Sequence, residues 1–104
     1  MKRVFICSPF AGDIERNIEV AKKICRMAMK QGYAPFAPHL LYPRFVDDLN
    51  PDERAAGINC GLSFMQICSE VWAFTGSGIS KGMQQELSYA REIGKTIVEI
   101  HEVE

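Results

Sequence analysis

The sequence predicts an α/β fold in which a small four-stranded parallel sheet carries helices on both faces. Four short runs of β-branched and aromatic residues alternate with three longer segments whose apolar residues recur at helical spacing. Strands separated by helices are typical of parallel sheets with right-handed crossovers. This order favours a doubly wound sheet of the Rossmann or flavodoxin-like kind, with strand order 2-1-3-4.

The composition limits the possible partners. The 104 residues are enough for a single domain, 1–104, and the net charge is -1. Because no broad basic field is present, we expect neither a polymeric nucleic acid nor a membrane as partner. The apolar run after Met1 is too short for a signal peptide, and Pro9 and Asp13 end it. We therefore expect a cytoplasmic protein.

The cysteines are expected to be reduced core residues. The chain has four, with no C-x-x-C pair among them and apolar neighbours around each: Cys7, Cys25, Cys60 and Cys68. Only His39 and His101 could join them as metal ligands, so we expect no metal site.

The first strand is expected from Arg3 to Cys7, closed by Ser8 and Pro9. After the loop 8–13, Asp13 can cap a helix whose apolar stripe runs to Ala28 and which Gly32 ends. The second strand, 33–37, contains a proline that cannot donate to the sheet, which places this strand at the edge.

Residues 38–49 form a long connection with aromatic residues, two acids, one arginine and one histidine. Long connections in compact domains tend to be functional. The alternative is a surface loop folded over an apolar edge.

The second helix begins with Asn50 as its cap, Pro51 at its first position and Glu53 completing a capping box. Gly57 and Gly61 permit close approach of another backbone, either the sheet or a second subunit. The expected inner stripe is Ala55, Ile58, Leu62 and Met65.

The third strand is expected at 71–74, with Trp72 in the core. A glycine-bearing turn follows, and Ser80 caps a third helix that ends near Gly94. Residues 95–100 form the fourth strand, and we expect the last four residues to be frayed.

Glu86 is the residue that most suggests chemistry. It lies on the apolar face of the third helix, which is formed by Met83, Leu87, Ala90 and Ile93. An ionised acid is rarely placed there without a function or a partner. The alternative is a structural carboxylate tied to backbone donors or to Tyr89.

The predicted topology brings the loops 8–13 and 75–80 together at one crevice. The helix that begins at Ser80 offers free N–H groups, and Gly78 and Gly82 allow close approach, so an anion such as a phosphate can bind there. Glu86 lies about 9 Å further along the helix axis. The chain lacks both the full phosphate-loop motif and G-x-G-x-x-G. An ordinary NTPase or dinucleotide dehydrogenase is therefore not indicated, and we expect no cofactor.

The pattern S-x-G-x-x-x-E-L-x-x-A-x-x-x-G-K from Ser80 to Lys95 resembles the nucleoside 2-deoxyribosyltransferase superfamily, which includes the 2'-deoxynucleoside 5'-phosphate N-hydrolases. The opening segment C-S-P-F-A-G matches as well, and the resemblance covers nearly the whole chain. A closer resemblance is to small bacterial and phage deoxyribosyltransferase-like domains of unknown function. Those share the S-P-[FY]-x-G-D opening, the P-H-L-L-Y-P connection and the G-[IM]-S-x-G-M motif.

The resemblance implies that Glu86 attacks the anomeric carbon of a 2'-deoxyriboside and forms a glycosyl-enzyme ester. It implies a small nucleoside or nucleotide as ligand, and we expect a homodimer or higher homo-oligomer. The candidate substrate-binding residues are Ser8, Phe10, Gly12, His39, Arg44, Asp48, Gly78, Ser80 and Gly82.

Two positions depart from the pattern of active members. Phe5 occupies the place of a tyrosine that helps to hold the nucleophile, and Asn59 and Leu62 occupy the region of the acid that protonates the leaving base. Glu70 starts the third strand and belongs to the opposite edge of the sheet. The acids and the histidine of the long connection can supply the proton only if that segment folds inward: His39, Asp47 and Asp48.

These departures leave alternatives open. A binding module of the same fold could sense a nucleotide or an ADP-ribose-like ligand without cleaving it, with Glu86 holding ribose hydroxyls. A dimeric scaffold with a vestigial pocket is a third interpretation. Release of free base separates the enzyme from the binding module.

Overall fold

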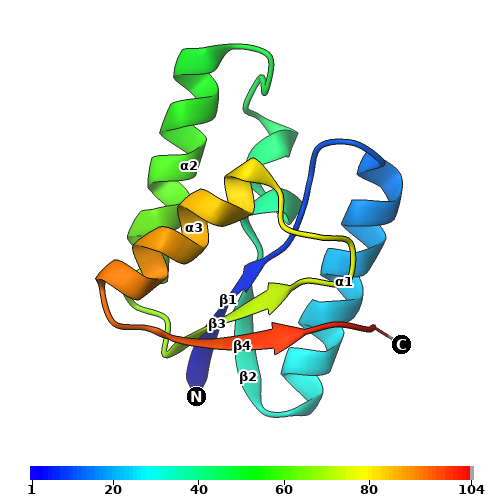
Figure 1. Cartoon of the computed structure of the whole chain (residues 1–104), viewed down its shortest axis with the longest axis vertical. Helices are drawn as coiled ribbons and strands as arrows, with labels where there is room; N and C mark the ends of the chain where they lie inside the picture. The colour runs from blue at the N-terminus through cyan, green and yellow to red at the C-terminus, as the bar shows by residue number, and fades with distance from the viewer. Residues whose placement is uncertain (104) are drawn as a thin grey trace.

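The predicted sheet is present in the computed structural model, which describes residues 1–103 (Figure 1). The strands pair in parallel in the order β2-β1-β3-β4, as expected. Their bounds are β1 (Lys2–Cys7), β2 (Tyr33–Phe36), β3 (Glu70–Phe74) and β4 (Thr96–Ile100). The helices are α1 (Ile14–Lys30), α2 (Pro51–Met65) and α3 (Lys81–Glu92), with short 3-10 helices η1 (Pro38–Leu40) and η2 (Tyr42–Arg44) between β2 and α2.

The two faces of the sheet are covered by different helices, as Figure 1 shows. On one face, Val4 and Ile6 of β1 pack with Ile24 of α1. On the other, Phe5 and Cys7 of the same strand pack with residues of α2 and α3. Successive side chains of a strand point to opposite faces, so the central strand β1 contributes to both cores. Burial on both sides explains its unbroken apolar run.

The edge position of β2 confirms the interpretation of its proline. Pro35 stands opposite Val4 in the register of β1 and β2, and β2 has no neighbour on its other side in the described sheet. Trp72 of β3 is buried as expected, and its Nε1 donates to Glu70 Oε1 at 2.7 Å. Glu70 therefore has a structural role at the edge of the sheet away from the crevice.

The three predicted helix caps form, with one difference at α2. Asp13 accepts from the Arg16 amide at 3.2 Å, and Ser80 Oγ accepts from the Met83 amide at 3.2 Å. Asn50 Oδ1 likewise accepts hydrogen bonds from the backbone amides of Asp52 and Glu53, the second and third residues of α2.

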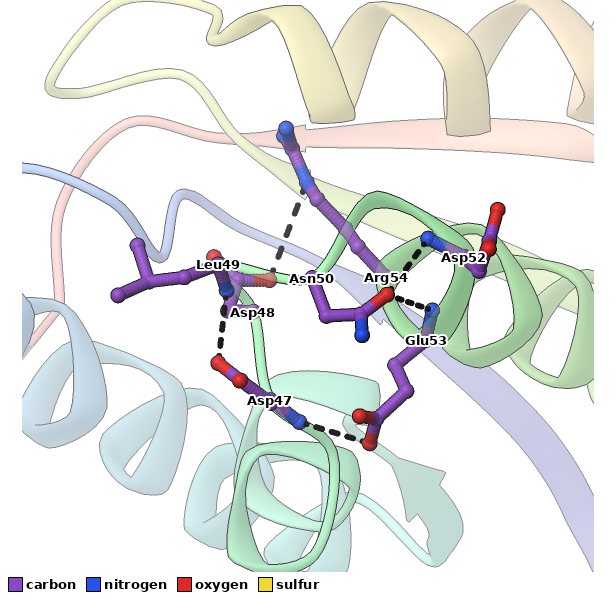
Figure 2. Close-up of polar contacts among 7 residues, drawn as sticks. All are labelled: Asp47, Asp48, Leu49, Asn50, Asp52, Glu53 and Arg54. Carbon is purple, nitrogen blue, oxygen red and sulfur yellow. Dashed lines mark hydrogen bonds and ion pairs between the residues drawn. The ribbon is translucent and has the colours of Figure 1, made fainter.

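The capping box predicted for Glu53 is wrong. Figure 2 shows Glu53 Oε1 accepting from the amide of Asp47, at 3.2 Å, instead of from that of Asn50. The Asn50 amide already donates to the Asp47 carbonyl oxygen at 3.1 Å. A turn within the connection thus takes the donor that a capping box would use.

The inner face of α2 also differs from the predicted stripe. Gly57 and Gly61 are buried with Met65, whereas Ala55 is exposed and Ile58 and Leu62 are only half-buried. The glycines face the connection between β2 and α2 instead of the sheet. A Cβ at Gly57 would lie 3.6 Å from the Val46 side chain, and one at Gly61 3.5 Å from Pro38, because the connection packs against this helix.

Three of the four cysteines are at least half-buried, as expected. Cys7 and Cys68 are buried and Cys25 is half-buried, but Cys60 is exposed because it lies on the outer face of α2.

The C-terminal tail is packed more closely than expected. The His101 ring contacts Thr75 Oγ1 at 2.8 Å, and Val103 packs beside α1, while Glu104 lies outside the described residues. Within residues 1–103, no helix has the length and apolar character to cross a membrane.

Candidate functional site

A cavity of about 170 Å³ lies at the carboxyl end of the sheet, where the sequence predicts a crevice. Its walls come from the loop after β1, the connection with η1 and η2, the helix α2 and the first turns of α3. The connection folds inward, and several of its residues form part of the cavity wall.

Most of the predicted site residues meet at this cavity. Those that line it are Phe10, His39, Asp48, Ser80, Gly82 and Glu86.

Four predicted residues do not line it. Ser8 is fully buried and meets His39 through its backbone. Gly12 and Gly78 are exposed turn residues with φ of 96° and 83°. Arg44 is exposed, and its Nε donates to the Leu40 carbonyl oxygen at 3.0 Å.

Glu86 is the most unusual group in the cavity wall. Its side chain reaches the cavity from the inner face of α3, yet the residue is only 8% exposed. Its Oε1 is fully buried and accepts no hydrogen bond in the described structure. Burial raises the pKa of Glu86 to about 7, partly offset by a hydrogen bond from Cys7. A carboxyl group with this pKa exists in both protonation states near neutral pH.

The structural alternative that the sequence left open for Glu86 finds no support in its contacts. Tyr89, the suggested partner, instead accepts a hydrogen bond from Gln66 Nε2 at 2.7 Å. A buried carboxylate oxygen without a partner costs free energy of folding, because it loses its hydration and gains nothing in return. Such a cost is typical of a group that acts on a ligand.

His39 and Phe10 form a flat wall of the cavity. Their rings stack with centroids 5.2 Å apart and an interplanar angle of 29°. Burial lowers the pKa of His39, against the opposing effects of a hydrogen bond with the Ser8 backbone and of the nearby Asp48 carboxylate. The imidazole is therefore neutral at neutral pH and presents an aromatic surface on which a planar base can stack.

Two cations also line the cavity, and neither was among the residues predicted for the site. Arg54 of α2 and Lys81 of α3 both line it. Arg54 Nε lies 3.8 Å from Asp48 Oδ1, in a half-exposed ion pair at the turn before α2 (Figure 2). Both cations stand in the first turns of helices, where a positive charge opposes the helix dipole. That unfavourable placement was the signal available in the sequence.

The two acids of the connection differ in whether they line the cavity. Asp48 and His39 line the same cavity as Glu86. Asp47 lies outside it and accepts from the Leu49 amide at 3.0 Å (Figure 2). Of the acids and the histidine of the connection, Asp48 and His39 are thus placed to exchange a proton with a molecule held beside Glu86.

Solved structures of three proteins share this fold. A 2-deoxyribosyltransferase from Bacillus psychrosaccharolyticus matches with a TM-score of 0.77 and 16% identity, over 93% of this chain and 70% of that chain. A 2-deoxyribosyltransferase from Leishmania mexicana matches with a TM-score of 0.69 and 16% identity, over 96% of this chain and 64% of that chain. The CMP N-glycosidase BcmB from Clostridium botulinum matches with a TM-score of 0.59 and 21% identity, over 94% of this chain and 67% of that chain. The chain spans about two thirds of the length of each. At these identities the likeness shows the fold alone.

Comparison at the level of sequence gives a family without an assigned activity. Among curated proteins, none matches the chain significantly. The sequence profile of a domain of unknown function, DUF7768, matches residues 2–100, which is nearly the whole chain. The protein, an α/β domain with a carboxyl-lined cavity and the fold of the deoxyribosyltransferases, therefore belongs to the DUF7768 family.

Proposed function

We propose that this protein breaks the N-glycosidic bond of 2'-deoxynucleosides or their 5'-monophosphates, by hydrolysis or by transfer to another base, with Glu86 as the nucleophile. The observation that carries the proposal is the buried Glu86 carboxyl, which has an unpartnered oxygen and faces a cavity. A flat aromatic wall and two cations in the same cavity suit a base and a phosphate. The fold shared with two deoxyribosyltransferases and an N-glycosidase supports the same reaction class.

In this mechanism, the ionised Glu86 attacks the anomeric carbon, and the bond from that carbon to the base nitrogen breaks. The base leaves with the electron pair and takes a proton that water supplies through Asp48 or His39, which line the same cavity. A water molecule or an acceptor base then attacks the glycosyl ester and frees Glu86. Because its pKa is about 7, a substantial fraction of Glu86 is ionised at neutral pH.

The start of α3 and the two cations are the proposed phosphate subsite. Ser80 caps α3, so the helix presents its positive end to the cavity. Arg54 and Lys81 line the same region and add full charges. This combination favours 5'-monophosphates over free nucleosides.

Replacing Arg54 with glutamine tests this subsite. A charge-assisted hydrogen bond contributes about 1.5 to 3 kcal/mol, so we expect KM for a monophosphate to rise about tenfold or more. KM for the free nucleoside should stay within about twofold. The matched control is Arg44→Gln, since Arg44 is an exposed arginine of the connection that does not line the cavity. Equal losses with both substrates would contradict an Arg54 contact to phosphate.

The proposed reaction itself is tested by incubating the protein with a panel of deoxynucleosides and their 5'-monophosphates. Chromatography then measures free base, with Glu86→Ala run beside the wild type. We expect base release that disappears in the variant.

If no substrate releases base even with an acceptor base added, the enzyme proposal fails. The nucleotide-binding alternative then predicts a rise in melting temperature with one member of the panel. A scaffold with a vestigial pocket predicts no such rise.

A further inference from the structure

Cys7 is the last residue of β1 and stands at the end of the strand where the cavity opens. It is fully buried, and its side chain lies on the same sheet face as that of Phe5, against α2 and α3. Phe5 packs on Phe36 with ring centroids 5.9 Å apart and has no hydrogen to donate. On this face of β1, Cys7 is thus the buried side chain that carries a donor.

The contacts of the thiol lead to Glu86. Cys7 Sγ lies 3.9 Å from the carbonyl oxygen of Met83, which is one turn before Glu86 in α3. The Glu86 carboxyl group lies beside the thiol, close enough for each group to shift the pKa of the other. A thiol has one hydrogen, so these two acceptors compete for it. The carboxylate is the stronger acceptor once it is ionised.

We propose that Cys7 is a positioning residue for Glu86, whose thiol donates to the ionised carboxylate and holds it toward the cavity. The effect on catalysis rests on the function proposed above, but the thiol and the carboxyl group are neighbours in the protein without substrate. It can therefore be tested independently of any reaction.

The thiol can serve as a donor over the whole neutral range. Burial, with the nearby Glu86 carboxyl as a second cause, raises the pKa of Cys7 well above its ordinary range. The group stays a protonated thiol and acts as neither a nucleophile nor a metal ligand. A hydrogen bond to the charged form of Glu86 stabilises that form, which opposes the effect of burial.

Several other groups face the cavity near Glu86 and can influence its titration. From the elements around it they are His39 in η1, Asp48 in the connection, Arg54 in α2 and Lys81 in α3. Among the described residues, Cys7 is the one whose side chain is a hydrogen-bonding neighbour of Glu86. Removing its thiol hydrogen should therefore change the titration of Glu86 while these four groups stay in place.

The test is a direct titration of Glu86 by NMR in protein labelled with ¹³C at the glutamate carboxyl carbons, with Glu86→Gln identifying the signal. In Cys7→Ala, the pKa of Glu86 should rise by about half a unit to one unit, because a thiol is a weak donor. In Cys7→Ser, a hydroxyl restores a donor, and the pKa should return to the wild-type value or below. Cys68→Ala is the matched control: Cys68 is a buried thiol in the same cluster that donates to the Phe64 carbonyl oxygen. Its loss should leave the titration unchanged.

A pKa of Glu86 that is unchanged or lower in Cys7→Ala would overturn the proposal. If that variant does not fold, Cys7→Ser provides the test. A pKa of Glu86 above the wild-type value in Cys7→Ser would then contradict the proposal. With a substrate in hand, we expect kcat in Cys7→Ala to fall about fivefold to tenfold with KM nearly constant, and Cys7→Ser to recover most of it. A shifted titration without any base release would leave the contact standing and remove the proposed reaction.

Discussion

Replacing Glu86 with glutamine is expected to lower the rate of base release by about a thousandfold or more, because an amide cannot form the glycosyl ester. The variant keeps the size and polarity of the side chain, so the fold and the cavity should be preserved. The measurement is single-turnover base release followed by chromatography, with the best substrate of the panel. Circular dichroism confirms that the variant is folded.

The control for this substitution is Glu92→Gln on the same helix. Glu92 is exposed near the end of α3 and does not line the cavity. It should keep the wild-type rate. If Glu86→Gln retained more than about a tenth of the wild-type rate, Glu86 would not be the nucleophile. If KM rose while kcat stayed constant, Glu86 would be a binding group for the sugar.

The free energy of unfolding is expected to decrease as the pH rises from about 5 to about 7. Glu86 has a pKa of about 7 in the folded protein against an ordinary value of 4.5, so between these values the folded state binds a proton that the unfolded state has lost. The free energy of unfolding therefore falls as the pH rises, and this decrease is complete above the pKa of the folded state. Each unit of difference between the two pKa values contributes about 1.4 kcal/mol, so the total decrease is about 3 kcal/mol.

Urea unfolding at several pH values between 5 and 8 measures this effect. His39 contributes with the opposite sign, because its lowered pKa means that the unfolded state gains the proton first as the pH falls. The difference between wild type and Glu86→Gln at each pH therefore isolates Glu86. Glu86→Gln should be the more stable protein at pH 8, and the advantage should vanish near pH 5. A difference that is independent of pH would show that Glu86 titrates normally.

The sequence by itself determined the framework of this protein. The alternation of strands and helices, the order 2-1-3-4 and the edge position of β2 all follow from periodicity, from Pro35 and from the handedness of crossovers. The caps at Asp13 and Ser80 depend only on residues a few positions away. The inward position of Glu86 is set by the period of α3. The caps and the helical face are local, so nearby residues suffice to predict them, whereas the strand order follows from the general rule for crossovers between parallel strands.

Only the tertiary structure decided how the irregular connection 38–49 is placed. It packs on α2, which turns Gly57 and Gly61 toward this segment and takes Glu53 away from its expected partner. Its inward fold brings His39 and Asp48 to Glu86 and leaves Arg44 at the surface.

The cations of the cavity and the meeting of Cys7 with Glu86 likewise join elements far apart in the sequence. A segment without periodicity gives no local signal of its direction. Contacts between distant elements depend on the packing of the whole chain, which the sequence pattern around any one residue does not contain.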